Sequence, residues 1–107
     1  MTYRVTYSPE AQQQLTDIFL WVANQRSSEA AERFVLSVYD FCDSLSTFPH
    51  RGIARDDLYP EMRTLGFRRR VMIAFIISER EVKIYGVYYG GRDHEGLIKN
   101  TLPDGGS

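Results

Sequence analysis

The alternation of apolar and polar residues predicts a short strand followed by two helices. Residues 3–7 (Tyr-Arg-Val-Thr-Tyr) alternate as a half-buried strand does. Ser8 and Pro9 favour a helix start, because a serine oxygen can cap the first amides and proline suits the first helical position. A second helix start follows at Ser27 or Ser28, and so short a link predicts an antiparallel helical hairpin. The apolar positions at helical spacing are Ala11, Leu15, Ile18, Phe19 and Val22 in the first helix and Ala31, Phe34, Val35, Val38, Phe41, Cys42 and Leu45 in the second.

The second half of the chain predicts three strands after a loop. Residues 48–60 contain prolines, a glycine and a charge cluster, and they lose all periodicity. The strand candidates that follow are residues 61–67, 68–79 and 81–90. The middle candidate is apolar on both faces, which is typical of a central, covered strand. The order β-α-α-β-β-β therefore predicts an α+β fold, in which a helical hairpin packs on one face of a mostly antiparallel four-stranded sheet.

Length and composition are those of one folded domain. The chain has 107 residues, of which 43% are hydrophobic. We expect a single domain over residues 1–95 and a flexible tail over residues 96–107, where turn-forming residues dominate. The only cysteine, Cys42, lies on the apolar stripe of the second helix, so we expect it in the core. A lone cysteine also excludes an internal disulfide and a cysteine-based metal cluster.

The sequence contains no segment typical of a membrane span, a secretion signal or a cofactor site. The longest apolar run, residues 71–77, has the length of a strand and falls short of the roughly 20 residues that cross a bilayer. The first residues lack a basic start followed by an apolar core, so we expect a cytoplasmic protein. His50 and His94 lie in different loops without metal-ligand spacing, and no phosphate-binding glycine loop is present. We therefore expect no metal and no other cofactor.

The net charge of −1 conceals an uneven distribution. Residues 61–92 carry seven basic side chains against three acidic ones, so this segment is +4 and the rest of the chain is −5. A basic segment on an otherwise acidic protein is a candidate site for a polyanion or an acidic protein. Solvated strand ends would give the same composition, and this alternative stays open.

Four stretches of the chain, taken together, are distinctive. They are YRVTYSPEAQQQL, LSTFPHRG, RTLGFRRRVMIAFII and IYGVYYGGRD. In this order and spacing over residues 3–95 they resemble the RelE/ParE superfamily of toxins from bacterial type II toxin–antitoxin systems. The resemblance implies a RelE/ParE-like fold with the element order predicted above, toxicity toward an essential bacterial machine, and neutralisation by an antitoxin encoded beside the toxin.

Two activities occur in this superfamily, and the side chains favour one of them. RelE-like members cut messenger RNA on the ribosome, whereas ParE-like members share the fold and inhibit DNA gyrase without that chemistry. The resemblance matches two RelE arginines to Arg68 and Arg92. However, Tyr59 and Glu61 stand where RelE-like members carry lysines. Leu97 or Ile98 stands where they carry a tyrosine. The chain therefore resembles the ParE-like branch.

The missing proton-transfer groups predict a toxin without catalytic residues. RNA cleavage needs a base, an acid and cations for the charge that gathers on phosphorus, and arginine supplies only the cations. We therefore expect Arg68, Arg70 and Arg92 to bind the target. If the protein is instead a RelE-like nuclease, Arg68 and Arg92 act with His94, whose imidazole titrates near neutral pH. A histidine between two acidic residues is more often simple polar surface.

Strand alternation predicts where several side chains point. Tyr85 and Tyr89 are expected on one face of the last strand, and Tyr88 on the other, packed in the core. Arg69 and Arg70 are expected to alternate at the start of the middle strand, so that one of them points away from the helices.

Trp21 and Tyr39 are the candidate antitoxin contacts. Trp21 lies off the apolar stripe of its helix and Tyr39 at the edge of the next stripe, and exposed aromatic residues dominate interfaces. Packing of both rings against the loop of residues 48–60 is the alternative. The resemblance implies a ParD-like antitoxin as partner, contact with DNA only through that antitoxin, no membrane association, and a heterotetramer or larger hetero-oligomer. We predict a toxin that inhibits DNA gyrase; the alternatives are a RelE-like endoribonuclease and an inactive relative that only binds antitoxin.

Overall fold

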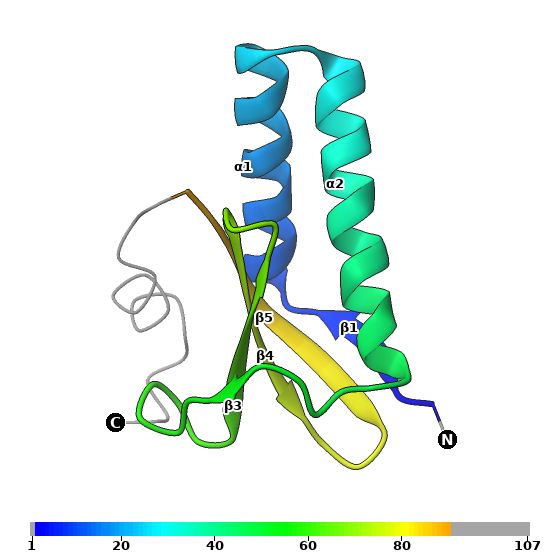
Figure 1. Cartoon of the computed structure of the whole chain (residues 1–107), viewed down its shortest axis with the longest axis vertical. Helices are drawn as coiled ribbons and strands as arrows, with labels where there is room; N and C mark the ends of the chain where they lie inside the picture. Colours follow the sequence, from blue (N-terminus) through cyan, green and yellow to red (C-terminus); the bar gives the residue numbers. More distant parts are fainter. Residues whose placement is uncertain (1, 91–107) are drawn as a thin grey trace.

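Two helices pack on one five-stranded sheet in the computed structural model, which describes residues 2–90 (Figure 1). The elements are β1 (Arg4–Tyr7), α1 (Pro9–Gln25), α2 (Ser28–Asp43), the 3-10 turn η1 (Ser44–Ser46), β2 (Ile53–Ala54), β3 (Met62–Phe67), β4 (Val71–Ile77) and β5 (Glu81–Tyr89). The strand order is β1-β5-β4-β3-β2, and only the β1–β5 pair is parallel. The predicted α+β class and the mostly antiparallel sheet are confirmed.

The sheet has one strand more than the sequence predicted. The short strand β2 lies inside the loop expected over residues 48–60 and pairs Ile53 with Thr64 of β3. Both residues of β2 are exposed, so no alternation of apolar and polar side chains marks it. Gly52, with a φ of +78°, lies so close to the Thr64 carbonyl that a side chain would clash. Close backbone approach, and not a side-chain pattern, produces this strand.

Both helices begin where the serine signals predicted. The Ser8 Oγ accepts a hydrogen bond from the Ala11 amide at 3.0 Å, and the Ser27 Oγ accepts one from the Ala30 amide at 3.1 Å. Each bond satisfies an amide that has no partner within its helix. The Ser8 amide also donates to the Ile84 carbonyl at 2.9 Å. The cap of α1 is therefore fixed directly on β5.

The apolar stripes of the two helices pack on one face of the sheet and form the main core. Residues of α1, α2, η1, β4 and β5 join in a single buried cluster. Cys42 is fully buried in it, so its predicted place in the core is confirmed. Burial of a large apolar side chain contributes about 1.5–3 kcal/mol, and most of the stability comes from this layer. The largest fully buried side chains of this cluster are Phe75, Leu15, Leu45, Ile73 and Ile84.

A smaller cluster lies on the opposite face of the sheet. Leu58, from the loop between β2 and β3, packs there with Met62, Ala74 and Tyr88. Tyr88 is only 3% exposed, so the prediction that it packs in the core is confirmed. A short loop therefore covers part of this face of the sheet, whereas two helices cover the other face.

The prediction that Tyr85 and Tyr89 share a face is wrong, because β5 contains a bulge. The register shifts between Ala74 and Phe75, so that Tyr85 and Gly86 together occupy the space of one residue opposite β4. One extra residue moves the following side chains to the other face of a sheet. Tyr85 consequently packs with the smaller cluster, and Tyr89 packs with the helices.

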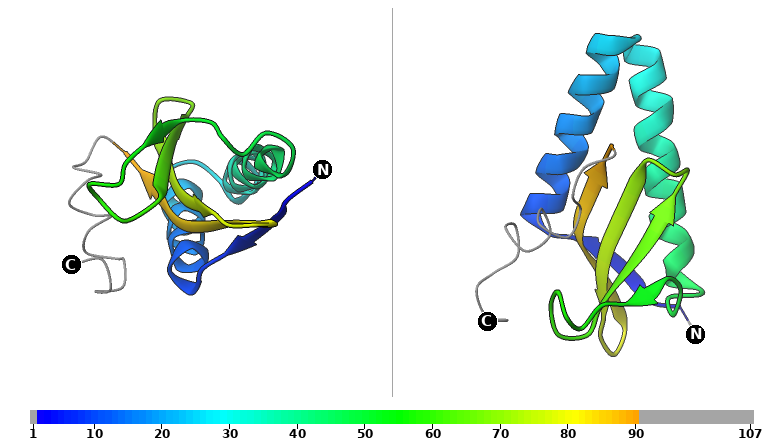
Figure 2. Two further views of the ribbon diagram at one scale, coloured as in Figure 1. Left: turned by 90° about the horizontal axis from the view of Figure 1, so that it is seen from below. Right: turned by 60° about the vertical axis from the view of Figure 1, so that its left-hand side comes forward.

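The helical hairpin extends beyond the sheet on the side of the β3–β4 turn (Figure 1). The right-hand view of Figure 2 shows this turn beside the middle of the helical hairpin and not at its base. The end of α1 and the start of α2, next to the α1–α2 connection, therefore extend past the β3–β4 turn and beyond the strands. In residues 2–90, neither helix is long and apolar enough to span a membrane.

Candidate binding site at the arginine turn

The turn between β3 and β4 consists of three arginines. They are Arg68, Arg69 and Arg70. Phe67, just before the turn, pairs with Val71, just after it. The prediction that these arginines begin a strand with alternating faces is wrong, because Arg68 and Arg69 have left-handed φ angles of +53° and +65°. Two left-handed residues in succession close a tight hairpin, and such positions usually hold glycine or asparagine.

Left-handed backbone is unfavourable for arginine, and neighbouring contacts hold the turn in place. Each such residue costs on the order of 1–2 kcal/mol. The Gly90 amide donates to the Arg70 carbonyl at 2.9 Å and fastens the turn to β5. The Arg68 guanidinium lies 5.1 Å from the centre of the Phe67 ring, which stacks on Phe41 of α2 with ring centres 4.4 Å apart. Retained backbone strain of this kind is frequent at functional sites.

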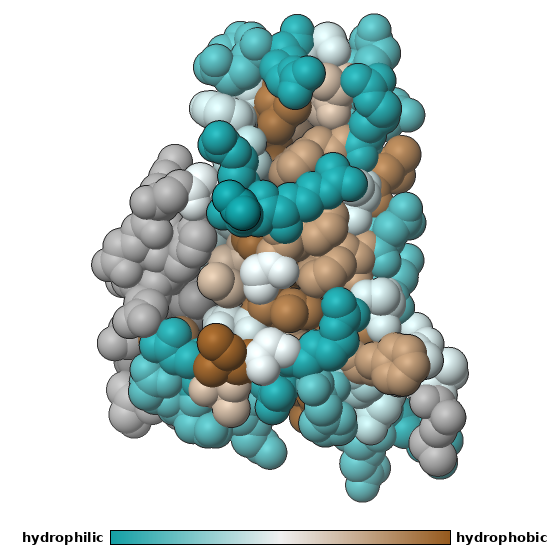
Figure 3. All heavy atoms as spheres, in the orientation of Figure 1, coloured by the Kyte–Doolittle hydropathy of each residue, from teal (hydrophilic) through white to brown (hydrophobic). Residues whose placement is uncertain are grey.

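Two of these arginines border a hollow near the connected end of the helical hairpin, where α1 ends and α2 begins. Its volume is about 440 Å³, within the range of small-ligand pockets. Figure 3 shows apolar atoms in the furrow between the helices, crossed by a hydrophilic band at the level of the turn. The lining residues of this arginine hollow are Trp21, Val22, Gln25 and Arg26 at the end of α1, Ala30 and Phe34 of α2, Arg68 and Arg70 of the turn, and Tyr89 of β5.

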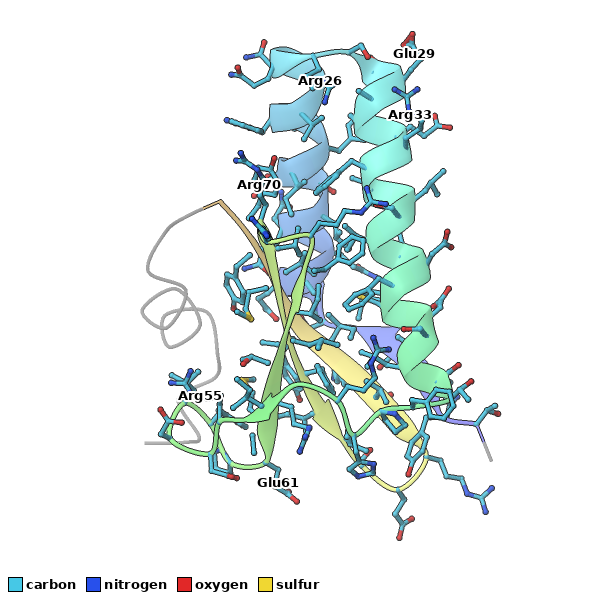
Figure 4. The ribbon with its side chains drawn as sticks, in the orientation of Figure 1. Arg26, Glu29, Arg33, Arg55, Glu61 and Arg70 are labelled. Atoms are coloured by element: carbon cyan, nitrogen blue, oxygen red, sulfur yellow. The ribbon has the colours of Figure 1, made fainter. Side chains whose placement is uncertain are left out.

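Within the described part of the chain, the lining of the arginine hollow carries positive charge and no carboxylate. Its charged lining residues are Arg26, Arg68 and Arg70, and all three are exposed. Figure 4 shows Arg26 near the α1–α2 connection and Arg70 at the turn below it. The ion pair found within residues 2–90 joins Arg55 to Asp57 at 2.8 Å, at the other end of the sheet. Guanidinium groups without an acidic partner are suited to bind a carboxylate or phosphate.

Three aromatic rings form the apolar floor of the hollow. The Tyr89 ring lies 5.3 Å from the Trp21 ring and 5.5 Å from the Phe34 ring, between centres. Trp21 is 51% exposed, whereas Phe34 and Tyr89 are half-buried. Exposed tryptophan beside arginine is the composition of many interface hot spots. The site therefore combines an apolar surface with anion recognition.

The structure brings together residues that the sequence assigned to different partners. Trp21 was predicted to contact an antitoxin, and Arg68 and Arg70 a target, yet all three line the arginine hollow. Sequence reasoning missed Arg26, because nothing in the pattern distinguishes it from other arginines at helix ends. It placed Phe34 only in the core stripe. Both residues reach the turn because the hairpin folds α1 and α2 back along the sheet.

Among the remaining predicted site residues, Tyr39 is described by the structure and does not line the hollow. Tyr39 is half-buried, and its ring packs edge-on against Tyr7 of β1 with ring centres 5.3 Å apart. It is thus a weaker candidate contact than Trp21. Arg92 and His94 lie outside the described residues.

The segment that precedes β3 lies at the opposite end of that strand from the arginine turn. Glu61 has a φ of +65°, and its amide donates to the Asp56 Oδ1 at 2.8 Å. The Tyr59 ring stacks on Tyr85 with ring centres 6.4 Å apart. Figure 4 shows Glu61 far from Arg70. These contacts close the loop against the sheet and add no cation to the hollow.

A second hollow of about 210 Å³ lies near this loop. Its lining contains both acidic and basic side chains, so it is not uniformly positive or negative. Within residues 2–90, no three side chains of His, Cys, Asp or Glu gather closely enough to hold a metal ion. The lining residues are His50, Ala54, Asp56, Glu61, Met62, Arg63 and Ile77.

Tyr7 and Cys42 form a buried pair at the base of the molecule. Burial is the main cause that raises the pKa of the Cys42 thiol to about 12. Burial also raises the pKa of Tyr7 far above its ordinary value, and the nearby thiol adds to this increase. The thiol is a weak partner, and the enclosed Tyr7 hydroxyl makes no well-formed hydrogen bond. Both groups are neutral at physiological pH, so Cys42 is not a nucleophile.

Comparison with known proteins gives a family match and a structural match. The family model described as the ParE toxin of the type II toxin–antitoxin system parDE matches residues 5–94. A chain of a solved structure, titled as the chromosomal ParDE TA system from P. aeruginosa, matches with a TM-score of 0.73 at 19% sequence identity. That match covers 84% of this chain and 98% of the other, and at such low identity it shows the fold alone. No curated protein gives a significant match.

Proposed function

This chain belongs to the ParE toxin family of type II toxin–antitoxin systems, and from this premise we propose that it inhibits DNA gyrase by binding to it. Arg68 and Arg70 provide the contact, since they are exposed beside an apolar surface. Arg92 is proposed as a further contact on sequence grounds.

The arginine hollow is the observation that supports binding without catalysis. Among residues 2–90, its lining includes three arginines and no histidine or carboxylate. Cleavage of RNA through its 2′-hydroxyl needs a general base, whose pKa must lie near the working pH. Arginine stays charged at any such pH, so it can hold an anionic group and cannot accept a proton from it. The hollow is therefore suited to grip an acidic surface.

The second proposed partner is a ParD-like antitoxin that forms a hetero-oligomer with this chain. Trp21 is the aromatic anchor, because half of its large ring surface is free to be buried by a partner. Tyr39 is already half-buried against Tyr7, so we expect a smaller loss of affinity from its removal. Contact with DNA is through the antitoxin only.

A supercoiling assay with purified gyrase tests the proposed activity. The wild-type chain is expected to block conversion of relaxed plasmid into supercoiled plasmid. The double variant Arg68→Ala/Arg70→Ala should inhibit at least about tenfold more weakly, because a hydrogen bond to a charged group is worth about 1.5–3 kcal/mol. The matched variant Arg4→Ala/Arg80→Ala removes two exposed arginines outside the hollow and should inhibit as wild type does. Full supercoiling in the presence of excess folded wild-type chain would contradict the proposal.

Primer extension on cellular messages separates gyrase binding from RNA cleavage. After induction of the wild-type chain, transcripts are expected to remain uncut. Cuts within codons that disappear in the Arg68→Ala variant would replace the proposed function with a RelE-like nuclease activity.

A further inference from the structure

The arginine hollow places an exposed aromatic ring and several guanidinium groups around one space of about 440 Å³. This volume is within the range of sites for one small ligand. We propose that the hollow binds a nucleoside di- or triphosphate, with the base stacked on Trp21 and the phosphates held by the arginines. The inference concerns the chain alone and does not rest on the proposed function.

The aromatic side of the hollow is suited to a flat ligand. The Trp21 ring leans against Tyr89, with ring centres 5.3 Å apart, and Tyr89 packs edge-on against Phe34. Trp21 is thus supported on one side and stays 51% exposed. A nucleobase stacks well on such a ring, since every base has a flat aromatic face.

Gln25 supplies polar groups beside the Trp21 ring. It follows Trp21 by four residues, so the two side chains lie on the same face of α1, and both line the hollow. The amide of Gln25 can donate and accept hydrogen bonds, as the edge of a nucleobase also does. This side of the hollow therefore offers a base both stacking and an edge contact.

The cationic side of the hollow calls for more than one phosphate. Arg26 at the end of α1 and Arg68 and Arg70 in the turn carry three positive charges, and no carboxylate among residues 2–90 lines the hollow. In Figure 4, Arg26 lies near the α1–α2 connection and Arg70 lies below it at the turn. A single phosphate monoester carries a charge of about −1.5 to −2 at neutral pH, so two or more linked phosphates balance three arginines better. Guanidinium groups bind phosphate oxygens through paired hydrogen bonds.

The turn holds two of these cations in place before a ligand arrives. The Arg68 guanidinium lies 5.1 Å from the centre of the Phe67 ring, and the Gly90 amide donates to the Arg70 carbonyl at 2.9 Å. Groups that are already positioned lose less freedom on binding, which favours affinity.

Bases joined to phosphates also occur in single-stranded nucleic acid, but the hollow favours a free nucleotide. Proteins that hold a strand offer a basic groove with successive aromatic platforms. Within residues 2–90, the lining of the hollow offers one exposed ring, Trp21, since Phe34 and Tyr89 are half-buried. The net charge of −1 also gives the chain no general attraction to a polyanion.

The indole N–H of Trp21 is the most direct probe, because the chain has one tryptophan. In proton–nitrogen correlation NMR spectra of the whole chain, added ADP should shift this signal in a saturable manner, with a Kd below about 1 mM. An indole signal that stays unchanged up to about 5 mM ADP would overturn the proposal.

A ligand series separates the base from the phosphates. In isothermal titration calorimetry, adenosine and pyrophosphate should each bind at least about tenfold more weakly than ADP, since each lacks one half of the contacts. Pyrophosphate that binds as tightly as ADP would reduce the hollow to a plain anion site and refute the proposal. Adenosine that binds as tightly as ADP would refute the role of the arginines.

A single-stranded RNA octamer distinguishes the two sources of a base with phosphates. It should bind more weakly than ADP, because the hollow holds one nucleotide. Tighter binding of the octamer would assign the hollow to nucleic acid and refute a site for the free nucleotide.

Two triple variants test the arginines. The variant Arg26→Ala/Arg68→Ala/Arg70→Ala should bind ADP at least about tenfold more weakly, because charge-assisted hydrogen bonds are lost. The control Arg4→Ala/Arg69→Ala/Arg80→Ala removes three exposed arginines that do not line the hollow and should bind ADP as wild type does. Circular dichroism verifies that both are folded. Equal weakening by the two variants would show a general charge effect and refute a specific site.

Two aromatic variants test the stacking. Trp21→Ala should weaken ADP binding by at least about fivefold, and Trp21→Phe should restore part of the loss, because it keeps a ring. The control Phe48→Ala removes a ring that is 70% exposed outside the hollow and should leave binding unchanged. Wild-type affinity in folded Trp21→Ala would refute stacking of the base on Trp21.

These experiments distinguish failure of this inference from failure of the proposed function. A wild-type chain that binds ADP and leaves gyrase fully active would end the proposed function alone. A wild-type chain that inhibits gyrase and does not bind ADP would end this inference alone.

Discussion

The two turns at the ends of β4 differ in both backbone and composition. The β3–β4 turn contains three arginines, and Arg68 and Arg69 are left-handed. The β4–β5 turn, residues 78–80, mixes a serine, an acid and a base, and has no left-handed residue. Closure of a hairpin therefore does not require left-handed arginines in this sheet. We infer that the arginines are present for contact, since the strained turn borders the arginine hollow and the relaxed one lies at the opposite end of the strand.

A change in the strand between the two turns should have the largest effect, because both turns depend on it. Phe75 is fully buried in the middle of β4. The Phe75→Ala variant leaves a cavity and should lower the free energy of unfolding by about 3–5 kcal/mol. Urea titration followed by circular dichroism measures this loss. A loss below about 1 kcal/mol would show that β4 does not anchor the core.

Alkaline pH should weaken the packing around Tyr7 and Cys42 at the base of the molecule. Folding raises the pKa of Cys42 from 9.0 to about 12, and it also raises that of Tyr7. The folded state thus holds these protons more tightly, so the stabilisation is complete below about pH 9 and falls as the pH rises toward 12, by up to about 1.4 kcal/mol per pH unit for each group.

Urea titrations between about pH 8 and pH 11 test this pH dependence. The control is Tyr7→Phe/Cys42→Ala, in which the decline should be shallower because both titrating groups are absent. Identical pH profiles for the two proteins would contradict the assignment of the decline to this pair.

Relief of the left-handed backbone should give a small gain in stability at one turn only. Arg68→Gly and Arg69→Gly are each expected to raise the free energy of unfolding by about 0.5–1 kcal/mol, since glycine adopts positive φ without steric cost. Glu79→Gly, in the relaxed turn, should be neutral or destabilising, because it only adds freedom to the unfolded chain. Thermal unfolding measures all three. Destabilisation by both arginine variants would show that the side chains, and not the backbone, dominate the energy of the turn.

The parts of the fold that sequence predicted are those encoded locally. Ser8 and Ser27 cap the helices because capping depends on residues only three positions apart. The bulge at Tyr85 could not be predicted, because it depends on the register of β5 against β4 and leaves the composition of the strand unchanged. Strand β2 could not be predicted either, because it arises from backbone pairing of Ile53 with Thr64 and no side-chain pattern marks it.

The candidate site was predicted in pieces and not as a unit. Arg68 was singled out through the family resemblance, Arg70 through the basic segment, and Trp21 because it lies off a helical stripe. Their meeting in one hollow depends on how far the helical hairpin extends past the sheet, which no local pattern encodes. Arg26 becomes a candidate only through that geometry.

The functional role of the strained turn is tested most directly by one supercoiling titration that compares Arg68→Gly with Arg69→Gly. Each variant removes one charge and relieves one left-handed residue, but only Arg68 lines the hollow. Arg68→Gly should inhibit gyrase several-fold more weakly than Arg69→Gly, which should inhibit as wild type does. Equal inhibition by the two variants would contradict a specific role for the hollow in contacting gyrase.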